Sequence, residues 1–126
     1  MSSLSRLCVF LVLTAAACTT TLPGTPIAIE TVAVEYPSSC AGVGIAPFRV
    51  QRDADALRYI DVASGNVRRL VWPSALAARL VDGTAILYAS DGSVVVRENE
   101  VIDNAGGCPR EDGSVLVTGL GDRFLK

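Results

Sequence analysis

Short apolar runs separated by turn residues occupy the chain from Ile27 onward. Within many of these runs apolar and polar residues alternate, which is the period-2 pattern of β-strands with one buried face. The pattern predicts strands over residues 27–35, 45–51, 57–62, 67–72, 84–89, 94–97 and 114–118. The sequence therefore predicts an all-β fold of about 6–7 short strands.

Turn residues punctuate these strands. Residues 64–66 (Ser-Gly-Asn) and 90–93 (Ser-Asp-Gly-Ser) supply the positive φ and the side-chain acceptors that tight hairpins need. Residues 75–80 favour one short helix capped by Ser74, although an extended strand fits them nearly as well. A meander, a short helix and a closing hairpin is the order of an OB-like barrel. We therefore expect a small OB-like barrel or a sandwich, with the OB-like topology leading.

The apolar residues of these runs form the expected core, because a half-buried strand turns every second side chain inward. They are Val43, Ile45, Phe48, Val50, Leu57, Tyr59, Leu70, Trp72, Leu76, Leu80, Ile86, Tyr88, Val94, Val96, Val101 and Val115. Three aromatic members have a second interpretation, since exposed rings on OB folds stack on sugars or other ligands. We interpret Tyr59, Trp72 and Tyr88 as core and keep a ligand-binding platform as the alternative.

The first residues have a different pattern. Arg6 precedes an unbroken apolar run over residues 7–13, and small residues follow up to Cys18. The run is much shorter than the roughly 20 residues of a membrane-spanning helix, so it is typical of a secretion signal. We expect residues 1–17 to be a signal peptide that directs the protein out of the cytosol.

Residues 15–18 read Ala-Ala-Ala-Cys and resemble the lipobox of bacterial lipoproteins. In that class signal peptidase II cuts before a cysteine that carries diacylglycerol, so the resemblance implies lipidation of Cys18. The class prefers Leu where this chain has Ala15, and the same segment also suits signal peptidase I, which would release an unlipidated chain. Cys18 would then be an odd exposed thiol in an oxidising compartment, which favours the lipoprotein.

A Thr- and Pro-rich segment, residues 18–26, follows the cleavage site. Its prolines forbid a regular helix, so we expect a tether that holds a single β domain, residues 27–126, roughly 25 Å from the lipid. In a cell with two membranes, Thr19 after the lipidated cysteine implies the outer membrane, facing the periplasm. In a cell with one membrane, the domain would lie on its outer face.

One pair of cysteines remains once Cys8 has left with the leader and Cys18 carries lipid. Cys40 and Cys108 lack the short CxxC spacing of redox or zinc sites, and oxidation is the default outside the cytosol. We expect a structural Cys40–Cys108 disulfide. The run between them faintly resembles small uncharacterised extracytoplasmic lipoprotein domains, notably at residues 71–73, 78–83 and 106–108. That resemblance implies no known activity and transfers no functional residue.

Chemical groups suited to catalysis are sparse. The chain has no histidine, which removes the group most easily tuned near neutral pH and the commonest zinc ligand. Asp53 and Asp55 are the nearest thing to a paired-carboxylate site, but their context predicts a solvated turn. Residues 103–107 lack the alternating ligands of a calcium loop. We expect no enzymatic activity, no cofactor and no bound metal.

The balance of charge bears on the partner. The net charge is −2, whereas nucleic-acid binding needs clustered basic residues, so we expect no nucleic-acid partner. What remains is a membrane-anchored extracytoplasmic module that binds another envelope protein without catalysis. The alternative is a module that binds a glycan or another small ligand through exposed aromatic residues.

Lipidation of Cys18 is directly testable. Intact-mass measurement on membrane-extracted protein should show the chain from Cys18 onward with added diacylglyceryl mass, because two acyl chains give stable anchoring where one does not. The Cys18→Ala variant should lose the lipid and its membrane attachment while the β domain still folds. A soluble product that begins at an unmodified Cys18 would contradict the prediction.

Overall fold

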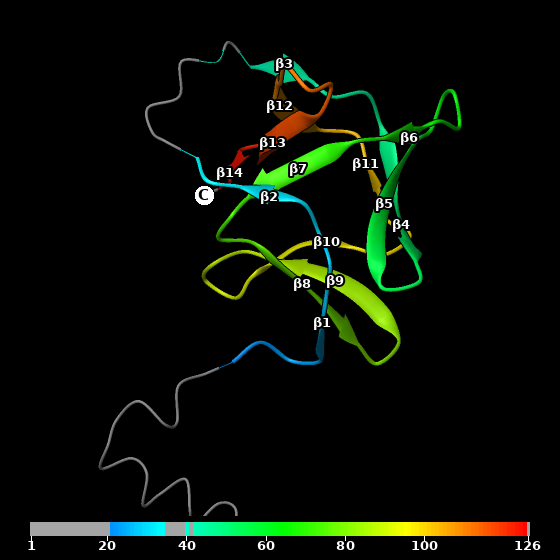
Figure 1. Ribbon diagram of the computed structural model, residues 1–126, viewed down its shortest axis with the longest axis vertical. Helices are drawn as coiled ribbons and strands as arrows, with labels where there is room; N and C mark the ends of the chain where they lie inside the picture. The colour runs from blue at the N-terminus through cyan, green and yellow to red at the C-terminus, as the bar shows by residue number, and fades with distance from the viewer. Residues whose placement is uncertain (1–20, 35–39, 41, 126) are drawn as a thin grey trace, which may run out of the picture.

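The computed structural model describes residues 21–34, 40 and 42–125, which form an all-β fold (Figure 1). The expected signal peptide and Cys18 lie outside these described residues. No helix occurs in the described part of the chain, and so none there could cross a bilayer. The predicted all-β class is confirmed.

The described residues form fourteen strands in three sheets. The first sheet has the order β1-β8-β9-β10, made of Thr25–Ile27, Ala77–Val81, Thr84–Tyr88 and Val94–Arg97. The second has the order β11-β4-β5-β6, made of Val101–Ile102, Phe48–Asp53, Ala56–Asp61 and Val67–Arg68. The third has the order β2-β7-β13-β12-β3, made of Thr31–Val32, Leu70–Pro73, Val115–Leu120, Ala105–Pro109 and Val43–Gly44, and β14 (Arg123–Phe124) pairs with β13.

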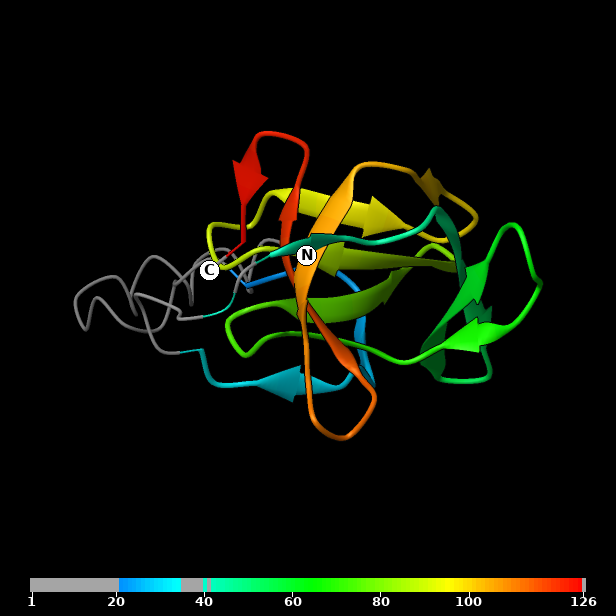
Figure 2. The same cartoon turned by 90° about the horizontal axis from the view of Figure 1, so that it is seen from above.

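The three sheets share one core (Figures 1 and 2). Leu87, Phe48 and Val117 come from the first, second and third sheet, and each is fully buried. The described strands do not close into a barrel, so the expectation of a barrel or a sandwich resolves to a sandwich-like fold. The leading OB-like barrel is not formed.

The main departure from that barrel begins at Arg69. The run over residues 67–72 was expected to be one strand, but it splits into β6 and β7, which belong to different sheets. β7 then lies between two parallel partners, β13 and β2. All four residues of β7 are buried, which is the pattern of a strand covered on both faces.

The short helix expected over residues 75–80 is wrong. Leu76 closes a turn onto the Pro73 carbonyl at 3.0 Å, and β8 begins at Ala77. β8 pairs with β1 on one edge and β9 on the other, so neighbouring strands satisfy its backbone groups. Tertiary pairing therefore outweighs the modest helix propensity of a segment too short to form two turns.

The expected strand number was also too low, because several strands are only two residues long and have no periodic pattern. β12 was missed for another reason: its residues, Ala-Gly-Gly-Cys-Pro, read as a loop. A Cβ on Gly107 would lie 2.3 Å from the Leu116 carbonyl oxygen, where β12 and β13 also shift register. Glycine is required there because the two backbones approach so closely.

The expected core is largely confirmed. Nine of its members are buried: Ile45, Phe48, Val50, Tyr59, Leu70, Trp72, Leu76, Tyr88 and Val96. Val43 and Val101 were placed there wrongly, since they are 45% and 43% exposed on two-residue edge strands. In β9 the deepest position is Leu87 rather than Ile86, because Leu87 lies directly opposite the buried Ala78 and Val96.

The Cys40–Cys108 disulfide is present, as expected. It connects the chain just before β3 to β12 and closes a loop of 68 residues. Because that loop contains most of the strands, the bridge restricts much of the unfolded chain.

Removing the bridge should destabilise the domain strongly. In the Cys40→Ser/Cys108→Ser double variant, we expect the free energy of unfolding to fall by about 4 kcal/mol, from the entropy that the open loop regains. Urea denaturation would measure the loss. Added reductant should lower the stability of the native protein and leave the double variant unchanged; equal stabilities of the two proteins without reductant would refute the prediction.

Candidate interaction surface

One face of the second sheet is covered by the core and the other is open to solvent. The inward side chains of β4, including Phe48 and Val50, are fully buried, and Tyr59 of β5 is 5% exposed. Residues directly opposite each other in paired strands point to the same side of a sheet. The register therefore determines which residues lie together on the open face.

A single row of residues crosses this open face. Val101 of β11 pairs with Arg49 of β4, Arg49 pairs with Ile60 of β5, and Ile60 pairs with Val67 of β6. Val62 lies in the turn just after β5, where its backbone N–H donates to the Pro47 carbonyl next to β4 at 3.0 Å. We call Val101, Arg49, Ile60, Val67 and Val62 the valine face.

The valine face is unusual for a solvated sheet surface, which is normally polar. Val62, Val67 and Val101 are 51%, 60% and 43% exposed. Arg49 lies within the row, donates to the Asn99 carbonyl at 3.5 Å, and forms no ion pair with any described residue. The face thus combines exposed apolar area with an uncompensated positive charge.

The hairpin between β5 and β6, which carries Val62 and Val67, is held by Asp61. One carboxylate oxygen of Asp61 accepts the backbone N–H groups of Ala63 and Ser64, each at 2.9 Å, and the other accepts Arg68 at 2.7 Å. These bonds, first that from Ser64 and then that from Arg68, lower the pKa of Asp61. These bonds hold the turn that carries Val62 and leads into β6, where Val67 lies.

The three aromatic residues kept as an alternative binding platform lie in the core. Tyr59, Trp72 and Tyr88 are 5%, 0% and 7% exposed. The indole N–H of Trp72 donates to the Tyr59 hydroxyl oxygen at 2.7 Å, and the two rings are 5.9 Å apart. Burial raises the pKa of Tyr59 to about 12. None of the three therefore offers an open ring on which a sugar could stack.

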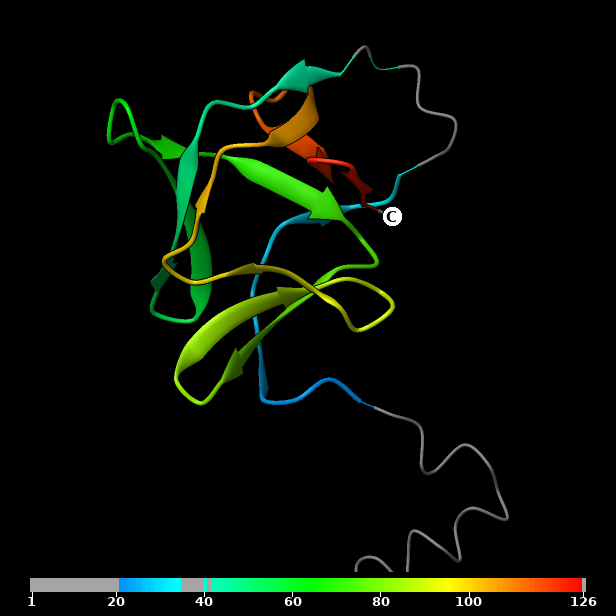
Figure 3. The same cartoon turned by 180° about the vertical axis from the view of Figure 1, so that it is seen from behind.

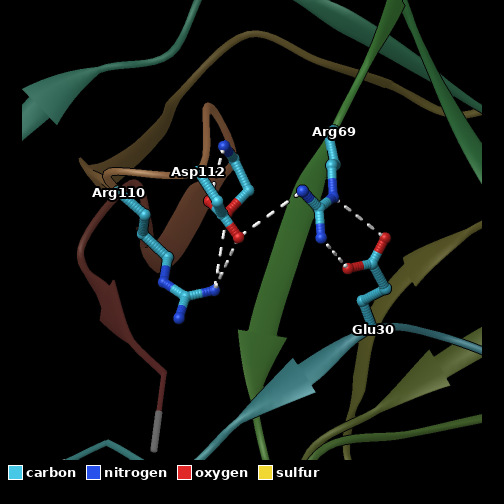
Figure 4. A network of polar contacts seen from close by, with 5 residues as sticks. Glu30, Arg69, Arg110 and Asp112 are labelled. Atoms are coloured by element: carbon cyan, nitrogen blue, oxygen red, sulfur yellow. Dashed lines mark hydrogen bonds and ion pairs between the residues drawn. The ribbon is translucent and has the colours of Figure 1, made fainter.

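A cluster of four charged side chains surrounds Arg69, the residue between β6 and β7 (Figure 4). Arg69 lies between Glu30 and Asp112, with ion pairs of 3.0 and 3.4 Å, and Arg110 approaches Asp112 from the other side. The pKa of Asp112 is lowered mainly by hydrogen bonds from Ser114, and then by the two arginines. Because all four charged side chains are at least one-third exposed, the cluster contributes little stability.

Arg68 and Arg69 are adjacent in the sequence, and each pairs with acidic side chains. Arg68 pairs with Asp61, whereas Arg69 pairs with Glu30 and Asp112. A shallow groove of about 310 Å³ runs beside them, but each arginine along it already has an acidic partner.

The remaining sequence candidates form no site. Asp53 makes an exposed ion pair of 2.9 Å with Arg58, and the backbone carbonyl of Asp55 accepts the N–H of Ala28. Residues 105–107, at the end of the calcium-loop candidate, belong to β12. Among residues 21–34, 40 and 42–125, no three acidic or cysteine side chains gather where they could hold a metal ion.

A glycine-lined hollow of about 400 Å³ lies near β3, β12 and β14. Its walls are mostly backbone, from glycines such as Gly44 and Gly106, and its charged side chains are Asp122 and Arg123. Arg123 already binds the Val94 carbonyl and the Ser93 hydroxyl. The hollow therefore has few free polar side chains with which to orient a ligand.

Comparisons with protein-family models, with curated proteins and with solved structures found no match. The valine face is therefore a candidate binding surface only on the basis of its geometry and exposure. Sequence reasoning missed it because it assigned Val67 to a continuous strand with Trp72 and Val101 to the core. A signal was present at Asp61, since an Asp at a strand end followed by Ser64 and Gly65 is typical of a side-chain-stabilised turn.

The Tyr59–Trp72 bond should contribute measurably to stability. In Tyr59→Phe the indole N–H stays buried without its acceptor, so the free energy of unfolding should fall by about 1–3 kcal/mol. Tyr88→Phe is the matched control, because the Tyr88 side chain makes no hydrogen bond with any described residue and is buried to a similar extent, at 7% exposed. Urea denaturation of both variants would test this; equal losses would contradict it.

The same residue predicts a dependence on pH. The pKa of Tyr59 is about 12 in the folded protein and 10.0 for the ordinary side chain, so the unfolded chain releases this proton first. The free energy of unfolding should therefore keep its full value below pH 10 and fall as the pH rises toward 12. Denaturation curves across this range should show the decline in the native protein and a smaller one in Tyr59→Phe.

Proposed function

We propose that the protein is a lipid-anchored, extracytoplasmic envelope protein that binds another protein through the valine face, without catalysis. The observation that carries the proposal is the row of exposed apolar residues on a sheet whose other face is core. Burying these side chains against a partner would remove apolar area from water, at about 25 cal/mol per Å². While the face stays in water, the three exposed valines contribute no such hydrophobic free energy.

The charge of the face indicates the chemistry of the partner. Arg49 has no acidic partner among the described residues, while the nearby Arg58 is paired with Asp53. A partner surface with apolar side chains and a carboxylate opposite Arg49 would match both properties. Such a charge would favour correct orientation and faster association more than raw affinity.

The alternative of glycan binding through exposed aromatic residues has less support. Its three residues, Tyr59, Trp72 and Tyr88, are buried, and two of them satisfy each other by a hydrogen bond. Export of the chain is supported by the Cys40–Cys108 disulfide, because such bridges persist in oxidising compartments. Lipidation of Cys18 rests on the motif in the sequence.

A crosslinking experiment in the native envelope tests the valine face. A photo-reactive amino acid at Val67 should capture a defined protein, and the same probe at Val43 should not, because Val43 is exposed on β3 of a different sheet. Adding Val101→Asp should lower the adduct yield about tenfold, equivalent to about 1.4 kcal/mol of binding energy. The reason is that binding would then bury the carboxylate of the introduced aspartate in the interface, at a cost in free energy.

The matched control is Val43→Asp, which places the same charge at a similarly exposed valine and should leave the adduct unchanged. Circular dichroism would establish that both variants fold. Either of two results would reject the proposal: no adduct from position 67, or equal adducts from positions 67 and 43.

A further inference from the structure

The segment expected to be a flexible tether is bound to the domain from its first described residues. The Arg79 guanidinium donates to the backbone carbonyls of Pro23 at 3.1 Å and Gly24 at 2.6 Å. A third bond of 3.3 Å reaches the carbonyl of Leu22. One side chain of β8 therefore holds three successive carbonyls of the incoming chain, and we call this arrangement the arginine clamp.

Backbone geometry holds the same segment. Gly24 has a φ of +76°, and a Cβ at this position would lie 2.1 Å from the Leu80 carbonyl oxygen. The chain thus passes against β8 at a distance that only glycine allows. Strand pairing follows at once, with Thr25 opposite Leu80 and Pro26 opposite Arg79. Residues 22–26 were expected to be tether and are instead part of the fold.

The remaining tether is short. Only Thr19 and Thr20 separate Cys18 from Thr21, the first described residue. Three residue steps span at most about 11 Å, since an extended chain advances no more than about 3.6 Å per residue. A lipid on Cys18 would therefore lie within about 11 Å of Thr21, well below the roughly 25 Å expected for a free tether.

The position of this segment identifies the first sheet as the part of the domain nearest the anchor. Leu22 shares a shallow hollow of about 260 Å³ with Ala75 and residues 89–92. Gly24 lies beside Val81, at the start of the β8–β9 turn. In Figures 1 and 3 the N-terminal segment leaves next to β1 and the β8–β9 hairpin, at the opposite end from β3 and β12.

We propose that the domain lies directly against the lipid headgroups in a fixed orientation, with the first sheet, including the turns at the two ends of β9, facing the bilayer. The arginine clamp sets this orientation by joining the lipidated terminus to β8. The inference rests on the proposed lipidation of Cys18. The end that carries β3 and β12 then faces away from the membrane.

The surface charge indicates the kind of lipid contact. Asp82, in the turn after β8, and Asp91, in the turn after β9, are both exposed. Arg123 donates to Ser93 beside Asp91 and offsets part of this negative charge, so the surface carries charges of both signs, which suits a zwitterionic headgroup. The lipid anchor, rather than charge attraction, supplies the affinity.

Energy transfer on vesicles tests the orientation. The natively lipidated full chain would carry one fluorescent donor on an introduced cysteine, either Ser90→Cys near the anchor or Glu111→Cys in the exposed β12–β13 turn. Phosphatidylcholine vesicles would contain acceptor-labelled headgroups. Transfer should be at least about twofold greater from position 90, because a domain of this size is roughly 30 Å across.

The Arg79→Ala variant tests the clamp. It should narrow the difference between the two positions, whereas Arg58→Ala, which removes an exposed arginine paired only with Asp53, should preserve it. Equal transfer from both positions in the native protein would overturn the fixed orientation. An unchanged difference in Arg79→Ala would overturn the role of the clamp.

The same preparation separates failure of this inference from failure of the proposed anchor. Intact mass and co-sedimentation with the vesicles report on lipidation alone. A protein without lipid mass that stays in solution would refute the anchor. A protein that carries lipid and binds the vesicles, with equal transfer from both positions, would refute only the orientation.

Discussion

The indole N–H of Trp72 is buried at the centre of the molecule, and it must find an acceptor there because an unpaired polar group in a core costs about 1–3 kcal/mol. Tyr59 supplies that acceptor at 2.7 Å and packs edge-on against Phe48 at 6.0 Å. The bond joins β7 of the third sheet to β5 of the second. It also commits Tyr59 and Trp72 to the interior, so neither ring is available on the surface for binding.

Charged side chains in this protein mainly organise turns and cross-strand contacts. Asp91 and Asp112 accept bonds from Ser93 and Ser114 in two Asp-Gly-Ser turns, and Asp61 holds the β5–β6 hairpin. Glu98 accepts the backbone N–H of Ala85 and pairs with Arg52. With these acids engaged structurally, the open face of the second sheet keeps its apolar row and the unpaired Arg49. The proposed binding surface rests on this apolar row and on Arg49.

The arginine clamp connects that surface to the proposed membrane anchor. Because residues 22–24 are fixed on β8, any force or orientation imposed at the N-terminus passes directly into the first sheet. The first and second sheets share one core, because Leu87 of the first sheet and Phe48 of the second belong to the same cluster of buried side chains. A surface held in a fixed orientation by such a link would lose less freedom on binding the proposed partner.

Local chemistry in the sequence determined the all-β class, most strand positions, the Asp-Gly turns and the Cys40–Cys108 pair. Each of these depends on neighbouring residues or on the parity of the cysteines. Only the tertiary structure decided that Val67 and Trp72 belong to strands of different sheets. It also decided that residues 77–81 are a strand and that residues 22–26 belong to the fold. The valine face and the arginine clamp also join residues distant in sequence, such as Val101 with Val67 and Arg79 with Gly24. Strand register and long-range pairing place those residues together, and neither is visible in a local pattern.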